Sequence, residues 1–134
     1  MAQLTLREPD AETDALAHAV IGASIEVHRR LGPGFLEQLY EEALCVELRL
    51  RDVPFERQKL VKAEYKGIYV GEGRFDLLVG QRLVVELKTV KSFAPIHRAK
   101  VISYLKLTGH QLGLLINFNV PVLKDGVQRV VLTR

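Results

Sequence analysis

The chain has 134 residues, of which 48% are hydrophobic and 26% are charged, and its formal net charge is +3. These proportions are typical of a folded globular protein and exclude an intrinsically disordered one. The length predicts one domain, spanning residues 1–134, that buries a sizeable core. The mildly basic charge permits nucleic acid as a partner without identifying one.

The sequence also argues against membrane and disulfide-stabilised proteins. No apolar run approaches the roughly 18 residues that cross a bilayer, and Met1–Thr5 lacks the basic and then apolar pattern of a signal peptide. Cys45 is the only cysteine, so neither an intrachain disulfide nor a cysteine metal cluster can form. We therefore predict a cytoplasmic protein with no membrane partner.

Two helices are predicted first. Thr13 is suited to cap a helix over Ala15–Leu31, in which apolar residues recur every three or four positions. Glycine and proline at 32–34 end it, and a second helix is expected from Phe35 to Arg51. Its predicted core face consists of Leu36, Leu39, Ala43, Val46 and Leu50, with Tyr40 and Leu44 alongside.

Two acidic residues of this second helix are notable. Glu37 falls at the edge of the apolar arc beside Tyr40, whereas Glu47 lies inside the arc without an evident reason. An acid in the first turn favours the helix dipole, and for Glu37 alone this structural role is the simpler interpretation.

The period then changes from that of a helix to that of strands. Three strands are predicted, a helix opened by Pro95 and ending at Gly109 follows, and two more strands complete the chain, the last joined through Lys124–Gly126. This order predicts an α/β fold with a mixed central β-sheet flanked by helices. The predicted strands are Lys59–Tyr65, Ile68–Val79, Leu83–Val90, Leu112–Phe118 and Val127–Leu132.

Three charged residues interrupt the apolar strands. Asp76 lies in the second predicted strand, and Glu86 and Lys88 lie two residues apart in the third, so they point to the same face. Burying an unpaired charge costs several kcal/mol, which predicts that these groups pair with one another or with a bound cation.

The turn between the two strands decides whether the acids meet. A two-residue turn would place Asp76 opposite Val85, whereas a three-residue turn over residues 80–82 would place it opposite Glu86. Two facing carboxylates repel, and a hard divalent cation such as Mg²⁺ removes the conflict. A purely structural acid–lysine pair remains the alternative.

A resemblance follows from the motifs and their order. Residues 34–40 read G-x-x-E-x-x-Y, and Asp76 and Glu86-Leu87-Lys88 follow downstream. The chain resembles the GxxExxY protein family, a branch of the PD-(D/E)xK nuclease superfamily. The resemblance implies a restriction-endonuclease-like core that uses Mg²⁺ or Mn²⁺. It also implies that Asp76, Glu86, the Leu87 carbonyl and Glu37 hold the metal, and that Lys88 acts on water or phosphate.

The third helix departs from related nucleases. Related nucleases of the exonuclease-V type carry Q-x-x-x-Y there, and the matching residues are Lys100 and Tyr104, so lysine replaces glutamine. The resulting lysine would contact a phosphate or compete with the metal for Glu86. Together with Arg98 and Tyr40, these two residues are our candidate nucleic-acid contacts.

Three hypotheses follow for function. The leading one is a metal-dependent nuclease that hydrolyses phosphodiester bonds of DNA or RNA, with Asp76, Glu86, Glu37 and Lys88 as catalytic residues. The second is a non-catalytic nucleic-acid-binding or protein-interaction module that keeps the nuclease fold. The third is an oligomeric scaffold whose charged cluster is structural. A homodimer is compatible with each, since symmetric dimers are common among small domains.

Overall fold

The computed structural model describes residues 9–132, and Met1–Thr5, on which the signal-peptide prediction depends, lies outside this range. The predicted order of elements is confirmed, with small changes at their ends. The first strand begins four residues earlier than predicted, and the third ends at Lys88 rather than Val90. The elements are α1 (Ala11–Leu31), α2 (Glu37–Leu50), β1 (Phe55–Tyr65), β2 (Ile68–Val79), β3 (Leu83–Lys88), α3 (Pro95–Thr108), β4 (Leu112–Asn117), a short 3-10 turn η1 (Leu123–Gly126) and β5 (Val127–Val131).

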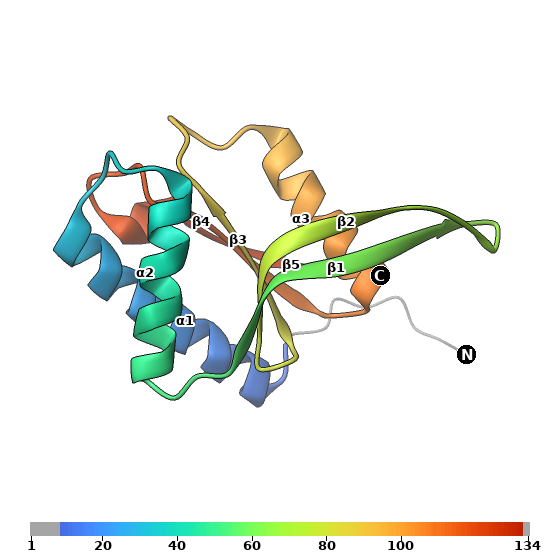
Figure 1. Ribbon diagram of the computed structural model, residues 1–134, viewed down its shortest axis with the longest axis horizontal. Helices are drawn as coiled ribbons and strands as arrows, with labels where there is room; N and C mark the ends of the chain where they lie inside the picture. Colours follow the sequence, from blue (N-terminus) through green and yellow to red (C-terminus); the bar gives the residue numbers. More distant parts are fainter. Residues whose placement is uncertain (1–8, 133–134) are drawn as a thin grey trace.

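The five strands form one sheet in the order β1-β2-β3-β4-β5. β3 and β4 run parallel because α3 connects them, whereas the other neighbours are antiparallel. The helices α1 and α2 pack on one face and α3 packs on the other (Figure 1). The prediction of an α/β fold with a mixed central sheet flanked by helices is therefore confirmed.

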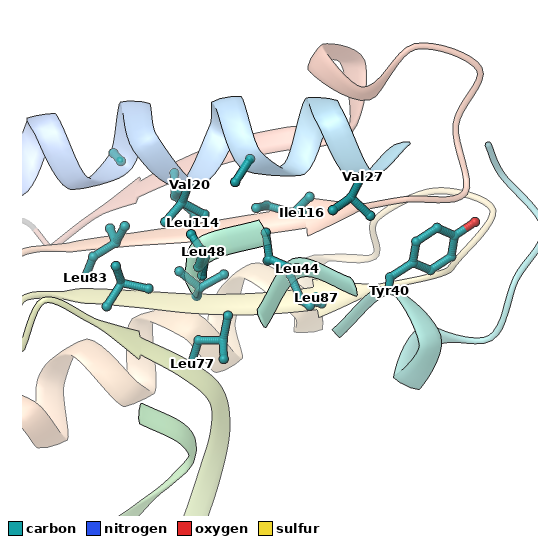
Figure 2. Close-up of a cluster of buried hydrophobic side chains, with 14 of the residues drawn as sticks. Val20, Val27, Tyr40, Leu44, Leu48, Leu77, Leu83, Leu87, Leu114 and Ile116 are labelled. Carbon is teal, nitrogen blue, oxygen red and sulfur yellow. The ribbon is translucent and has the colours of Figure 1, made fainter. Parts of the chain in front are cut away.

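The α1 helix begins earlier than the sequence suggested. Asp10, not Thr13, is the N-cap, and its carboxylate accepts a hydrogen bond of 2.8 Å from the Thr13 amide. The buried face of α1 includes Val20, Ala23 and Val27, as the three-and-four spacing predicted. These side chains join the larger of two core clusters, which Figure 2 shows between the helices and the sheet.

The predicted core face of α2 is wrong. Leu36, Val46 and Leu50 are 81%, 53% and 74% exposed, while Tyr40, Leu44 and Leu48 are buried against the sheet (Figure 2). Two apolar stripes lie side by side on this helix, and the sequence pattern alone does not decide which one the sheet covers. The stripe with Tyr40 is covered because the Tyr40 ring stacks on Phe118 and its hydroxyl donates to the Gly32 carbonyl.

The position of Glu47 also has an explanation. Glu47 accepts a hydrogen bond of 2.7 Å from the Arg51 guanidinium one turn later, so it belongs to a surface ion pair. Glu47 does not lie in the core because the neighbouring apolar residues Val46 and Leu50 face solvent, not the sheet.

The long β1–β2 hairpin has two parts. Near the body, Leu77–Val79 of β2 pair with Leu83–Val85 of β3. Beyond that point, β2 pairs only with β1, through a bulge at Ala63/Glu64, and the two strands extend well past the body (Figure 1). The strands β2 and β3 thus separate at the position of Asp76. No helix within residues 9–132 has the length and apolar character needed to cross a membrane.

Candidate functional site

The connection between β2 and β3 sets the register of the two acids. Val79 pairs with Leu83, and the Arg82 amide donates to the Val79 carbonyl, so the turn contains three residues, 80–82. In this register Asp76 stands opposite Glu86, which is the second of the two alternatives that the sequence allowed.

At Asp76, hydrogen bonds from backbone amides to the two carboxylates take the place of the backbone hydrogen bonds that join β2 to β3 further along. The Leu87 amide donates to Asp76 Oδ2 at 2.7 Å, and the Asp76 amide donates to Glu86 Oε1 at 3.0 Å. Phe75 and Leu77 lie two residues apart in β2, so in a regular strand they would share a face of the sheet. Their side chains instead belong to the core clusters on opposite faces, which shows that β2 is twisted irregularly between them. The irregular twist separates β2 from β3 and leaves a gap that the two acids occupy.

Burial and repulsion make Glu86 an unusual carboxylate. Glu86 is only 6% exposed, and its burial, followed by the charge of Asp76, raises its pKa to about 8. Lys88 Nζ lies 3.9 Å from Glu86 Oε2 on the same side of β3 and opposes this rise. A metal-free site therefore holds a proton near neutral pH.

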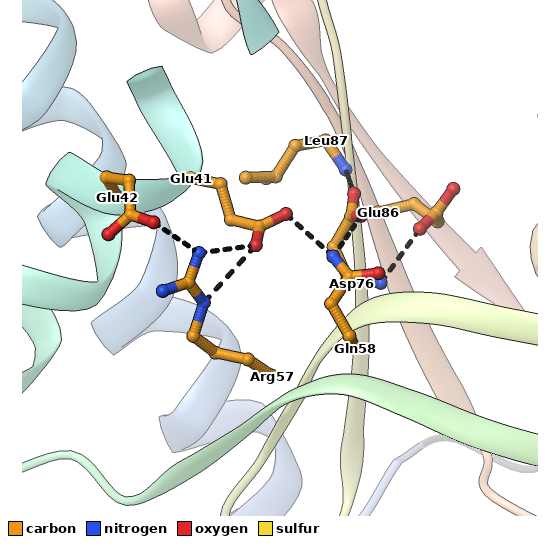
Figure 3. Close-up of polar contacts among 7 residues, drawn as sticks. All are labelled: Glu41, Glu42, Arg57, Gln58, Asp76, Glu86 and Leu87. Carbon is orange, nitrogen blue, oxygen red and sulfur yellow. Dashed lines mark hydrogen bonds and ion pairs between the residues drawn. The ribbon is translucent and has the colours of Figure 1, made fainter. Parts of the chain in front are cut away.

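A network of hydrogen bonds holds Asp76 from the side of α2 (Figure 3). The Gln58 side-chain amide donates to Asp76 Oδ1 at 3.3 Å and to Glu41 Oε1 at 3.0 Å. The Arg57 guanidinium in turn donates to Glu41 and to Glu42. Gln58 stands opposite Asp76 in the β1–β2 register and adopts a left-handed φ of 50°, rare for a residue other than glycine. This backbone distortion lets one amide reach both carboxylates.

Sequence reasoning missed these network residues. Glu41 follows Glu37 by one helical turn, and this spacing was an available signal for a shared face. Nothing in the sequence indicates the left-handed backbone of Gln58, or the contact of Arg57 with a helix 16 residues earlier. The network connects α2 to β1 and fixes one Asp76 oxygen.

Glu37 approaches the site but does not join the acid pair. Burial raises the pKa of Glu37, the Lys88 ammonium opposes this effect, and the Asp76 carboxylate adds to it. Residues 9–132 contain no group of three or more His, Cys, Asp and Glu side chains placed to hold a metal ion. The structure thus brings together Asp76, Glu86 and Lys88, with Glu37 at the margin.

The candidate nucleic-acid contacts have different outcomes. Tyr40 is fully buried, so its prediction as a contact is wrong, and the physical reason is its packing against Phe118. Tyr104 is 7% exposed and donates to the Arg74 carbonyl at 2.9 Å, which holds β2 beside the acids. Lys100 and Arg98 are exposed on α3.

The expected role of Lys100, contact with a phosphate or competition with the metal for Glu86, stays a prediction. Among the residues that the structure describes, Glu86 forms its ion pair with Lys88, and Lys100 forms none with it. Lys100 is exposed to solvent on α3.

The residues present fit a hard divalent cation. Two carboxylates converge at the gap, and because the N–H and C=O of a strand residue point to the same neighbour, the Leu87 carbonyl faces the gap with its amide. All three groups would bind a metal through oxygen atoms, which suits Mg²⁺ or Mn²⁺. A cation would also remove the repulsion that raises the pKa of Glu86.

A mixed sheet with α3 between its parallel strands, and an acid pair with a lysine where two strands separate, define a nuclease-like α/β domain. Residues 14–130 match the family model described as PD-(D/E)XK nuclease superfamily, and the chain therefore belongs to this superfamily. The match does not extend to the GxxExxY branch, which stays a prediction.

The comparison with known structures supports the fold alone. The crystal structure of SSO0001 is similar, with a TM-score of 0.51 and 18% sequence identity over 72% of this chain. The matched part is 49% of that chain, so the present chain spans about half its length. The restriction-endonuclease-like fold is thereby confirmed. A search of curated proteins found no match.

Proposed function

We propose that the protein is a metal-dependent nuclease that hydrolyses phosphodiester bonds of DNA or RNA. The observation that carries the proposal is the convergence of Asp76 and Glu86 with Lys88 at the gap between β2 and β3. Membership of the PD-(D/E)XK nuclease superfamily supports it.

The proposed roles follow from where each group lies. Asp76, Glu86 and the Leu87 carbonyl would hold the metal, with Glu37 as a further acid on the α2 side. Bound Mg²⁺ or Mn²⁺ would stabilise negative charge on the phosphate and lower the pKa of a water molecule. Lys88, about one-fifth exposed, would hold either the water or a phosphate oxygen by its ammonium group.

The remaining assignments are proposals of the same kind. Arg98 and Lys100 on the exposed side of α3 would contact phosphates of the nucleic acid. Tyr104 would act by positioning β2 rather than by touching the substrate. We place the protein in the cytoplasm and propose that it forms a homodimer, for which α2 supplies a candidate surface.

Cleavage of labelled single-stranded DNA, duplex DNA and RNA tests this function. The wild type and Lys88→Ala would be compared with Mg²⁺, with Mn²⁺ and with a chelator. We expect metal-dependent cleavage that falls at least about a hundredfold in the variant, since a positioned charge of this kind contributes that much. Cleavage that is equal in the two proteins would indicate a contaminating nuclease.

A non-catalytic nucleic-acid-binding or protein-interaction module is the second candidate. The exposed Lys100, at the position where related nucleases carry glutamine, favours it. Salt-dependent binding of nucleic acid without turnover in either metal would support this alternative and contradict the nuclease.

A further inference from the structure

The outer face of α2 carries an apolar stripe whose four large side chains are exposed, while Ala43 at its middle also packs partly against the core. Its residues follow one another at intervals of three and four, which is the spacing of a helix seam that packs on another helix. Four of them are 40% to 81% exposed, and the fifth is a small residue at the middle. The stripe consists of Leu36, Leu39, Ala43, Val46 and Leu50, and we call it the α2 seam.

An exposed seam of this kind marks an interaction surface. Phe35, next to its first residue, is 44% exposed as well, so the apolar patch continues beyond the helix. We propose that the α2 seam is the interface of a homodimer in which two copies of α2 pack antiparallel about a two-fold axis.

The shape of the surface favours a second copy of this helix. A groove of about 550 Å³ at the start of α2 is lined by Gly34, Phe35, Leu36, Gln38, Leu39 and Glu42. At the other end of the seam, Leu50 is 74% exposed. Antiparallel packing that sets Leu39 beside the partner's Leu50 brings the exposed side chain of one copy to the groove of the other, twice by symmetry.

The same register suits the middle of the seam. Ala43 then lies beside the partner's Val46, and Val46 beside the partner's Ala43. A small residue opposite a larger one allows the two helices to approach closely without a void.

Charges beside the seam are self-complementary in this arrangement. Glu42 and Arg49 are exposed and lie seven residues apart, so they flank the seam on one side. A two-fold axis between antiparallel helices sets each Glu42 beside the partner's Arg49. Within the described residues, Arg57 contacts only Oε1 of Glu42, and Oε2 is available for this second ion pair. Parallel packing would instead place the Glu42 and Arg49 side chains of the two copies on opposite sides of the seam, where they could not pair.

The size of the seam predicts a reversible dimer. One pair of 14-residue helices lies at the small end of specific interfaces, below about 1,200 Å² of buried surface. We therefore expect a dissociation constant in the micromolar range rather than a permanent dimer.

Sedimentation velocity of the full chain, from micromolar to millimolar concentration, measures this equilibrium. Val46→Glu places a charge in the seam and is expected to raise the dimer dissociation constant by at least about tenfold. Val122→Glu is the matched control, because Val122 is 50% exposed outside α2, and it should leave the constant unchanged. A wild type that stays monomeric, or equal effects of the two variants, would overturn the proposal.

A charge exchange tests the antiparallel register itself. Glu42→Arg and Arg49→Glu should each weaken the dimer, and the double variant should recover most of its affinity. A double variant whose loss of dimer affinity equals the sum of the losses in the two single variants would contradict the two-fold pairing. The seam contains neither of the paired acids nor Lys88, so this outcome is independent of the nuclease proposal.

Discussion

The substitution Glu86→Gln should change how the stability of the metal-free protein depends on pH. The pKa of Glu86 is about 8 in the folded protein against 4.5 as its ordinary value. Between these two values the folded state keeps a proton that the unfolded chain has already lost. The free energy of unfolding of the wild type should therefore decrease as the pH rises from about 4.5 to 8.

The size of the effect follows from the same interval. Each pH unit of it is worth about 1.4 kcal/mol, so the loss amounts to several kcal/mol by pH 8, with about 5 kcal/mol as the ceiling. Glutamine at position 86 carries no proton to lose, and its amide oxygen can still accept from the Asp76 amide. The variant should lack this decrease and should be more stable than the wild type near pH 8 without metal.

Urea denaturation at several pH values, in the presence of a chelator, is the assay. The difference between the two proteins isolates Glu86 from His110, whose pKa is lowered by burial and whose contribution therefore grows with rising pH. Added Mg²⁺ should restore the wild type near pH 8 and leave the variant nearly unchanged. A wild type whose stability is flat or rises relative to Glu86→Gln over this range would refute the reasoning.

Two further substitutions test the support of the site and the core. Gln58→Leu removes the amide that holds Asp76, and it should weaken Mn²⁺ binding about tenfold in calorimetry. Gln81→Leu is its control, because Gln81 has a similar left-handed φ and donates to Glu56 away from the site. In denaturant, Leu48→Ala should cost about 2 to 5 kcal/mol, whereas Leu107→Ala, at a 45% exposed position, should cost under about 1 kcal/mol.

Each of these comparisons has a contrary outcome. Equal Mn²⁺ affinity in the two glutamine variants would mean that the hydrogen bond to Asp76 does not position the ligand. Equal losses in the two leucine variants would mean that the buried face of α2 is not the one around Leu48.

The sequence predicted the framework of the site because short-range patterns determine it. The apolar patterns and the positions of glycine and proline locate the helices and strands, although not η1, and the register of β2 and β3 reduces to the length of one turn. Once that turn has three residues, Asp76 must face Glu86. The parts of the site that lie within one hairpin could therefore be predicted from the sequence.

The contacts of α2 could not be predicted from the sequence in the same way. The helix carries two adjacent apolar stripes, and only its packing on the sheet shows that Tyr40 is buried and Leu50 is exposed. The bridge from Glu41 through Gln58 to Asp76 depends on a distorted backbone and on contacts between separate elements. Neither feature has a local signature in the sequence.

Direct measurement of cation binding tests the proposed site most sharply. Mn²⁺ titration of the metal-free protein, followed by electron paramagnetic resonance, would compare the wild type with Asp76→Asn and with Asp125→Asn, an acid in η1 away from the gap. We predict saturable binding to the wild type and to Asp125→Asn, and at least about a tenfold loss of affinity in Asp76→Asn. Equally tight binding by all three proteins would contradict the assignment of the gap between β2 and β3 as a metal site.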